Sequence, residues 1–138
     1  METLKPRGIL ITLSDYFEKT KGKGIIATAD AKGKVGMAVY GRPHLINEKT
    51  AAFIMADRLM NKNLQSNPSA SYLFVEEGPR YAGKRLYLTK IKEEKDSDLV
   101  NQLRSKGSCP VDESYKQGQR FVVYFKVNKV LPLIGAKS

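Results

Sequence analysis

The stretch TAAFIMADRLMNKNLQSNPSASYLFVE, which runs from Thr50 to Glu76, decides how we interpret the fold. Both of its ends contain β-branched and aromatic side chains, which are typical of strands. Its middle predicts a short helix, because Asp57 is a suitable N-cap and the Asn67-Pro68 pair disfavours a longer helix. The predicted elements are a strand at 50–56, a helix at 57–64 and a strand at 71–76.

Outside this stretch the hydrophobic pattern also favours strands. The last predicted strand is the clearest case, since alternation places Phe121, Val123, Phe125 and Val127 on one face. Other strands are predicted at 24–29, 35–40 and 84–92, with one helix on Leu10, Leu13 and Phe17 ending at Gly22 and another from Asp96 or Ser97 to Gly107. Six short strands and too few helices for repeated βαβ units predict a mainly β fold, an antiparallel barrel formed by one domain over 1–138.

The composition narrows the class of protein. The chain has 138 residues, of which 41% are hydrophobic, and this suits a folded domain. Lys and Arg number 24 against 14 Asp and Glu, so the net charge of +10 favours anionic partners such as nucleic acid, a phosphorylated cofactor or a membrane surface. No apolar run approaches the ~20 residues of a membrane span and no secretory cleavage pattern is present, so we expect a cytoplasmic protein.

Several motifs carry little functional weight. A single Cys and a single His exclude an internal disulfide and any zinc site made only of these residues. GKGIIA at 22–27 matches the dinucleotide pattern G-x-G-x-x-A, but its glycines follow a predicted helix and precede a strand, so we expect a turn. GPRYAGKR at 78–85 resembles a phosphate-binding loop that lacks the Ser or Thr for magnesium. His44 is expected as an exposed imidazole in a turn, and nothing marks Cys109 as activated.

The positive charge and the aromatic residues leave one alternative open. Seven Tyr and five Phe side chains provide rings on which bases stack in oligonucleotide-binding barrels. The basic residues are nevertheless spread along the whole chain, and the densest group, Lys19, Lys21 and Lys23, contains no aromatic residue. A non-catalytic nucleic-acid-binding β-barrel therefore stays as the alternative function, while nucleic acid is the less favoured partner.

The helix predicted at 57–64 contains a possible phosphate site. Arg58 and Lys62 are four residues apart and therefore lie on one face of this helix. Free backbone N–H groups at a helix start favour an anion, and the amide of Asn63 adds a further donor. A charged surface helix without a ligand explains the same spacing, and Asp57 must point away as the cap for a phosphate to bind.

The order of these segments resembles that of the FMN-binding split-barrel family, the family of pyridoxamine 5'-phosphate oxidase. The resemblance is carried by GIIATAD, a glycine turn, KVGMAVY, the stretch from Thr50 to Glu76, and GPRYAGKRLYLTKIKEE, and it covers about Phe17 to Val127. It implies a six-stranded antiparallel split β-barrel that forms a homodimer, with one FMN in each of two grooves along the subunit interface. It also implies an oxidoreductase that transfers hydride or electrons between the flavin and a small substrate.

The resemblance further implies which residues hold the cofactor. Arg58 and Lys62, with Asn63, would bind the phosphate at a strand-to-helix corner that also contains Asp57 and Leu59. Backbone groups of Met37, Ala38, Val39 and Tyr40 would meet the polar edge of the isoalloxazine ring, and Met55 and Ala56 would lie beneath the ribityl chain. Tyr81, Lys84 and Arg85 are further candidates, contributed by the second subunit.

One difference from the vitamin B6 oxidases of this family bears on the substrate. Those enzymes carry a basic C-terminal segment that helps to hold the substrate phosphate, whereas residues 130–138 here read VLPLIGAKS. We therefore expect an FMN-dependent reductase or a small electron carrier rather than a true vitamin B6 oxidase. Some relatives bind a deazaflavin or haem, and haem is disfavoured because the only His is predicted in a turn. No catalytic side chain is expected, since the flavin supplies the redox chemistry.

Overall fold

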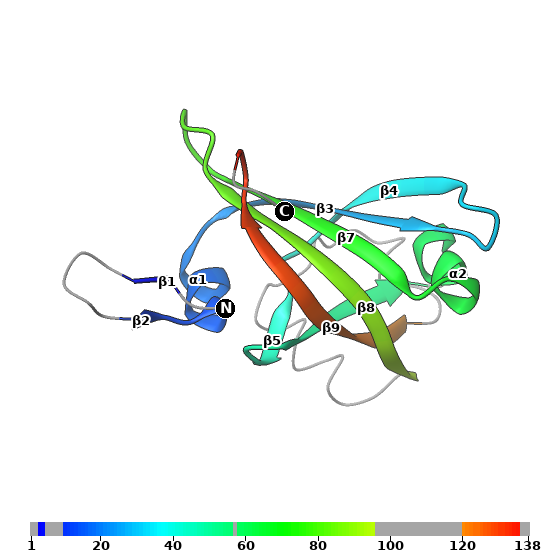
Figure 1. Ribbon diagram of the computed structural model, residues 1–138. Helices are drawn as coiled ribbons and strands as arrows, with labels where there is room; N and C mark the ends of the chain where they lie inside the picture. Colours follow the sequence, from blue (N-terminus) through cyan, green and yellow to red (C-terminus); the bar gives the residue numbers. More distant parts are fainter. Residues whose placement is uncertain (1–2, 5–9, 57, 96–119, 136–138) are drawn as a thin grey trace.

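The computed structural model describes residues 3–4, 10–56, 58–95 and 120–135 (Figure 1). The described elements are β1 (Thr3–Leu4), β2 (Leu10–Ile11), α1 (Leu13–Lys19), β3 (Gly22–Ala29), β4 (Val35–Tyr40), β5 (His44–Asn47), β6 (Thr50–Ala56), α2 (Leu59–Ser66), β7 (Ser69–Glu76), β8 (Gly83–Lys95) and β9 (Arg120–Pro132). Strands β3 to β9 form one sheet in the order β4-β3-β7-β8-β9-β6-β5, in which every pair of neighbours is antiparallel. The prediction of a mainly β, antiparallel fold is confirmed.

The sheet curls into an open barrel around an aromatic core. Strands β4 and β6 stand far apart in the sheet order, yet the rings of Tyr40 and Phe53 lie 6.4 Å apart across the core. Phe53 also meets Tyr72 at 5.0 Å and Phe125 at 5.6 Å, so strands from both halves of the sheet contribute to one cluster. Helices α1 and α2 cover opposite ends of the barrel (Figure 1). Phe17 of α1 reaches the same cluster and is buried.

All six predicted strands are present, and the sheet contains a seventh, β5. This strand was not predicted, because four residues with two polar ends carry little periodicity. His44, expected in a turn, is the first residue of β5 and is half-buried. Cys109 and the helix predicted from Asp96 or Ser97 lie outside the described residues.

Two of the three predicted helices lie in the described ranges, and both are shifted along the chain. The first begins at Leu13 rather than near Leu10, because Leu10 and Ile11 pair with β1 and the side chain of Thr12 caps the helix by accepting from the backbone N–H of Asp15 at 3.0 Å. The second begins at Leu59, with Arg58 at the N-cap position, and extends to Ser66. Asp57, predicted as the cap, lies outside the described residues.

The strand predicted at 24–29 begins two residues earlier, so the turn expected at the glycines is not formed and both Gly22 and Gly24 lie in β3. Glycine is required there because neighbouring groups approach the backbone closely. A Cβ at Gly24 would collide with the hydroxyl of Tyr72, and a Cβ at Gly22 would collide with the carbonyl oxygen of Val75. The Tyr72 hydroxyl donates to the carbonyl of Gly41 at 3.0 Å, so this contact also joins β7 to the end of β4.

Candidate cofactor site

The predicted phosphate site lies where β6 ends and α2 begins. The backbone N–H of Arg58 donates to the carbonyl of Ala56 at 2.8 Å, which turns the chain sharply into the helix. Arg58 occupies the N-cap position in an extended conformation, and no side-chain hydrogen bond caps the helix. The first N–H groups of α2 are therefore left for another acceptor, and the helix dipole makes this end favourable for an anion.

Two cations stand on the exposed side of this corner. Arg58 and Lys62 are both exposed, and the N–H of Lys62 donates to the carbonyl of Arg58 at 2.9 Å in the first turn of α2. Within the part of the chain that the structure describes, neither side chain forms an ion pair. The structure thus places a guanidinium, an ammonium and a helix start together, a donor set that suits a phosphate.

Asn63 is placed differently from its two predicted companions. It is only 6% exposed, and its side-chain amide donates to the hydroxyl of Thr28 at 3.0 Å. That hydroxyl in turn donates to the sulfur of Met60 at 3.3 Å. These bonds hold α2 against β3, so Asn63 positions the helix and does not face the solvent beside Arg58 and Lys62.

Strand β4 runs beside the corner and exposes an apolar row. Gly36 lies directly under α2, where a Cβ would come within 2.9 Å of the Met60 methyl group and 3.2 Å of a Leu59 methyl group. The side chains on the opposite face of β4 are strongly exposed, with Val35 at 77%, Met37 at 72% and Val39 at 65%. Ala38 and Tyr40 pack instead against the core.

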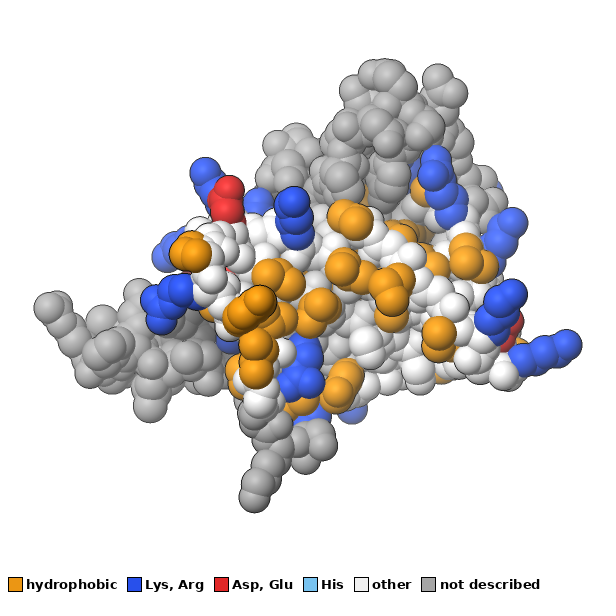
Figure 2. Space-filling model, turned by 90° about the horizontal axis from the view of Figure 1, so that it is seen from above, with side chains coloured by type: hydrophobic (Ala, Val, Ile, Leu, Met, Phe, Trp, Pro, Cys, Tyr) orange, Lys and Arg blue, Asp and Glu red, His pale blue; other side chains and the backbone are white. Residues whose placement is uncertain are grey.

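The apolar row of β4 continues across neighbouring strands. Val39 pairs with Ile25 and Met37 with Ala27 on β3, and Ile25 pairs in turn with Leu73 on β7. A shallow hollow of about 240 Å³ lies over these strands and extends to Tyr87 on β8. We call this surface, made of Ile25, Ala27, Val35, Met37, Val39, Leu73 and Tyr87, the outer apolar face. Figure 2 shows hydrophobic side chains gathered on the side where β3, β4 and β7 lie in Figure 1.

The predicted ribityl contacts are buried. Met55 is fully buried in the core cluster, and Ala56 is 7% exposed at the end of β6. Both residues lie next to the corner in the chain, but their side chains point away from solvent. Leu59, which is 58% exposed and packs beside Gly36, is the apolar side chain that the corner presents.

The remaining predicted residues lie at the far end of the sheet. Along β3, Thr28 pairs with Ala70 near α2 whereas Gly22 pairs with Glu76 near the β7–β8 hairpin, a separation of roughly 20 Å at the usual rise per residue. Tyr81, Lys84 and Arg85 belong to this hairpin, which projects away from α2 in Figure 1. Within one chain they are therefore not brought to the corner.

Two of these hairpin residues already have partners. The Arg85 guanidinium donates to the carbonyls of Pro132 at 2.9 Å and Gly135 at 2.7 Å. The Lys84 ammonium lies 4.5 Å above the ring of Tyr16, whose hydroxyl donates to the Glu76 carboxylate at 2.6 Å. Burial, followed by Glu76, raises the pKa of Tyr16, and burial lowers the pKa of Lys84. This cluster joins α1 to the hairpin, whereas Tyr81 is exposed.

Sequence reasoning missed most of the outer apolar face. Met37 and Val39 were singled out for their backbone groups, while Ile25, Leu73 and Tyr87 were read only as members of strands. A signal was present, because VGMAVY at 35–40 is apolar at nearly every position, which is typical of a strand covered on both faces. Such a pattern on an exposed strand indicates a surface that another molecule covers.

This chain is similar in structure to several known proteins. No protein-family model and no curated sequence matches the chain. An FMN-binding protein from Syntrophomonas wolfei subsp. wolfei superposes with a TM-score of 0.72 at 14% identity, over 90% of this chain and 85% of its own. An F420 reductase superposes with a TM-score of 0.68 at 11% identity, over 88% of this chain and 98% of its own. The haem-storage protein HutZ from Vibrio cholerae superposes with a TM-score of 0.57 at 18% identity, over 88% of this chain and 94% of its own.

These likenesses concern the fold. In the part of the chain that the structure describes, no helix is long and apolar enough to cross a membrane. The matched proteins share the curled antiparallel sheet and together cover nearly all of this chain. The chain therefore has the split β-barrel fold that its segment order predicts, and its resemblance to the FMN-binding split-barrel family is confirmed at the level of the fold.

Proposed function

We propose that this chain binds FMN between two copies of itself and transfers hydride or electrons between the flavin and a small substrate. One observation carries the proposal. Two cations without ion pairs among the described residues stand at an uncapped helix start, directly beside an exposed apolar strand. FMN combines a phosphate with a flat, largely apolar ring, and this surface offers a partner to each part.

Each part of the site has a separate role in holding the cofactor. Arg58, Lys62 and the first N–H groups of α2 would bind the phosphate through charge-assisted hydrogen bonds. Strand β4 ends the sheet order, so one edge of its backbone has no neighbouring strand in the described sheet. That edge would donate to and accept from the polar rim of the ring, while Met37 and Val39 cover its apolar part.

In this proposal a second copy of the chain completes the cofactor site. The outer apolar face is a contiguous patch of the kind that marks an interface, and a two-fold axis through it would pair the same patch on both copies. In such a dimer the β7–β8 hairpin of one copy can approach the corner of the other. Tyr81, which is exposed, would then reach the cofactor from the partner, as the family resemblance implies, whereas the Arg85 guanidinium is held by carbonyls of its own chain.

When bound, the flavin would supply the hydride or electron chemistry. The protein would bind the phosphate, orient the ring along β4 and exclude water from one ring face through the outer apolar face. This division of labour fits a reductase or an electron carrier with a small substrate.

Flavin is favoured over haem and over nucleic acid. The matched proteins named above include an FMN-binding protein and an F420 reductase as well as a haem-storage protein. His44, the only histidine of the chain, lines a hollow beside α1 and is not part of the corner. Most aromatic rings in the described ranges are buried or half-buried and so are not free to stack on bases, as Phe53, Tyr72 and Phe125 show, whereas Tyr81 and Tyr87 are exposed.

A visible absorption spectrum tests the proposal. The protein is incubated with FMN, desalted and scanned, and retained bands near ~370 and ~450 nm are expected from the bound flavin. Arg58→Ala and Lys62→Ala should each weaken FMN binding by about 1–3 kcal/mol, because each removes a charged hydrogen bond.

A matched control removes two exposed cations away from the corner, with Lys21→Ala and Lys49→Ala combined in one variant. This variant should bind FMN as the parent protein does. A protein that fails to retain FMN, or equal affinities in all variants, contradicts the proposal. A Soret band after incubation with haem, without flavin retention, would replace FMN by haem.

A further inference from the structure

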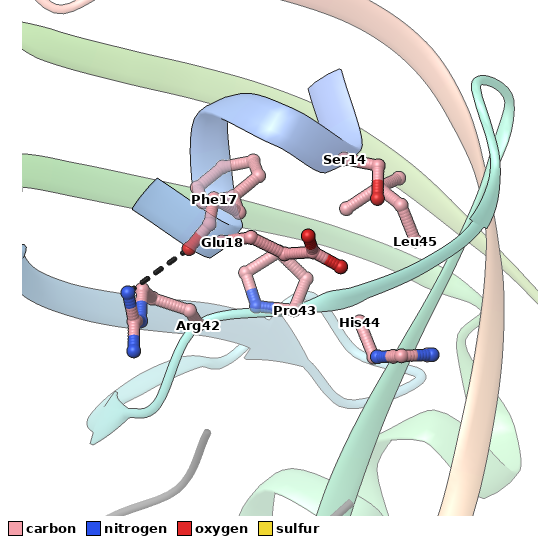
Figure 3. Close-up of a pocket in the computed structure, with 7 residues that line it drawn as sticks. All are labelled: Ser14, Phe17, Glu18, Arg42, Pro43, His44 and Leu45. Carbon is pink, nitrogen blue, oxygen red and sulfur yellow. Dashed lines mark hydrogen bonds between the residues drawn. The ribbon is translucent and has the colours of Figure 1, made fainter. Parts of the chain in front are cut away.

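A second hollow lies between α1 and the segment that leads into β5, apart from the corner and from the outer apolar face (Figure 3). Its volume is about 270 Å³. Phe17, Pro43 and Leu45 are buried and form its apolar floor. Ser14, Glu18 and His44 stand around its rim, so polar groups surround an apolar base.

The walls of this hollow are fixed by hydrogen bonds at both ends of α1. At the C-terminal end, the Arg42 guanidinium donates to the carbonyls of Phe17 at 3.0 Å and Thr20 at 3.1 Å. At the N-terminal end, the backbone N–H of Leu13 donates to both carboxylate oxygens of Glu48, at 3.1 and 3.0 Å. The helix is thereby held over the 42–48 segment, and the hollow is already formed before any ligand enters.

The rim provides a carboxylate with an available charge. Glu18 forms no ion pair with any residue in the described ranges, and its side chain extends over the ring of Pro43 in Figure 3. Ser14 lies four residues earlier on α1 and so shares the same helix face. A carboxylate and a hydroxyl both accept hydrogen bonds, and an ammonium group is the donor that satisfies them best.

We propose that this hollow binds a small organic ammonium ion. Its charged end would meet Glu18 and Ser14, and its short apolar body would lie on Phe17, Pro43 and Leu45. The volume falls just below the roughly 300–1,000 Å³ of sites for drug-sized ligands, which limits the ligand to a small amine. Arg42 also lines the hollow, but its guanidinium is held by the carbonyls of Phe17 and Thr20 at the C-terminal end of α1. A carboxylate of equal size placed beside Glu18 would meet a like charge, and an alcohol would lack the ionic contact.

An NMR titration of the ¹⁵N-labelled full chain tests this assignment with three ligands of the same shape. Phenethylamine is the probe, and 2-phenylethanol and 3-phenylpropanoate are its neutral and anionic counterparts. Saturable shifts are expected for the amides of 14–18 and 42–45 with the amine, and much smaller ones with the other two ligands. Equal binding of the anion, or shifts confined to other parts of the chain, overturns the proposal.

Two variants assign the charge to its residue. Glu18→Gln keeps the shape of the side chain and should weaken amine binding about three- to tenfold, the range for an exposed to partly shielded ion pair. Glu77→Gln removes another exposed carboxylate, from the loop between β7 and β8, and should leave binding unchanged. The same spectra report whether each variant is folded. Unaltered affinity in the Glu18 variant, or an equal loss in both variants, overturns the proposal.

Discussion

Replacing Val39 by lysine tests the interface between two copies in the most direct way. Val39 is the last member of the exposed row of β4 and is 65% exposed in the single chain. Its neighbours across the ladder are apolar, since it pairs with Ile25, so a lysine there enters an apolar environment if the surface is covered. An uncovered surface would tolerate the same lysine with little effect.

The expected loss follows from the exposed fractions. Fully burying a Val or Met side chain stabilises by about 1.5–3 kcal/mol. Scaled by exposure, Val35, Met37 and Val39 together would contribute about 4 kcal/mol per copy, and twice that per dimer, because a two-fold interface uses each residue twice. Val39 alone accounts for about 2.4 kcal/mol per dimer, and the Kd for dimerisation should therefore rise at least about 50-fold in Val39→Lys.

Sedimentation velocity over a concentration series measures this Kd. Ile46→Lys is the matched control, because Ile46 is also an exposed aliphatic residue but lies on β5, at the other edge of the sheet. This control should dimerise as the parent protein does. The reasoning is refuted if Val39→Lys dimerises normally, if Ile46→Lys dissociates instead, or if the parent protein stays monomeric at every concentration.

Three further predictions concern stability. Asn63→Ala removes the donor to Thr28 and should lower the free energy of unfolding by about 1–3 kcal/mol in urea denaturation. Gly24→Ala should destabilise the protein in the same assay, because the added Cβ meets the Tyr72 hydroxyl, and the loss should be smaller in a Tyr72→Phe background. The pKa values of Tyr16 and Tyr72 are raised, chiefly by burial, so the stability that they contribute is present below pH 10 and is lost as pH rises further. Absorbance titration at alkaline pH checks this, and Tyr16→Phe should remove one late-titrating group.

Much of the fold could be predicted because its signals are local. The strands at 24–29 and 71–76 could be predicted from their β-branched and aromatic residues. The barrel was implied by the resemblance in segment order to the FMN-binding split-barrel family. The predictions that were wrong concern residues whose roles depend on neighbours that are distant in the chain. Gly22 and Gly24 look like turn residues until β7 is placed beside them, since only then does the close approach of Tyr72 explain them.

The candidate site also contains residues that local spacing predicts and residues whose placement depends on distant parts of the chain. The spacing of Arg58 and Lys62 placed both on one exposed helix face, and the structure brings them together at the start of α2. The direction of Asn63 could not be predicted, because it depends on a hydroxyl 35 residues away on β3. The outer apolar face could not be predicted either, because it depends on the sheet order. That order puts β4 at an edge, β3 beside β4, and β7 beside β3.

The position of β4 also bears on how two copies of this chain could pair. A strand that is both apolar and at a sheet edge can meet other chains in two ways, through its face or through its backbone edge. Pairing through the face ends at two copies, whereas pairing through the edge can continue into fibres. Lys32 and Lys34 in the β3–β4 turn place like charges at the end of that edge and oppose its pairing with another copy. In the proposed dimer, pairing of two copies and resistance to further pairing would therefore use different sides of one short strand.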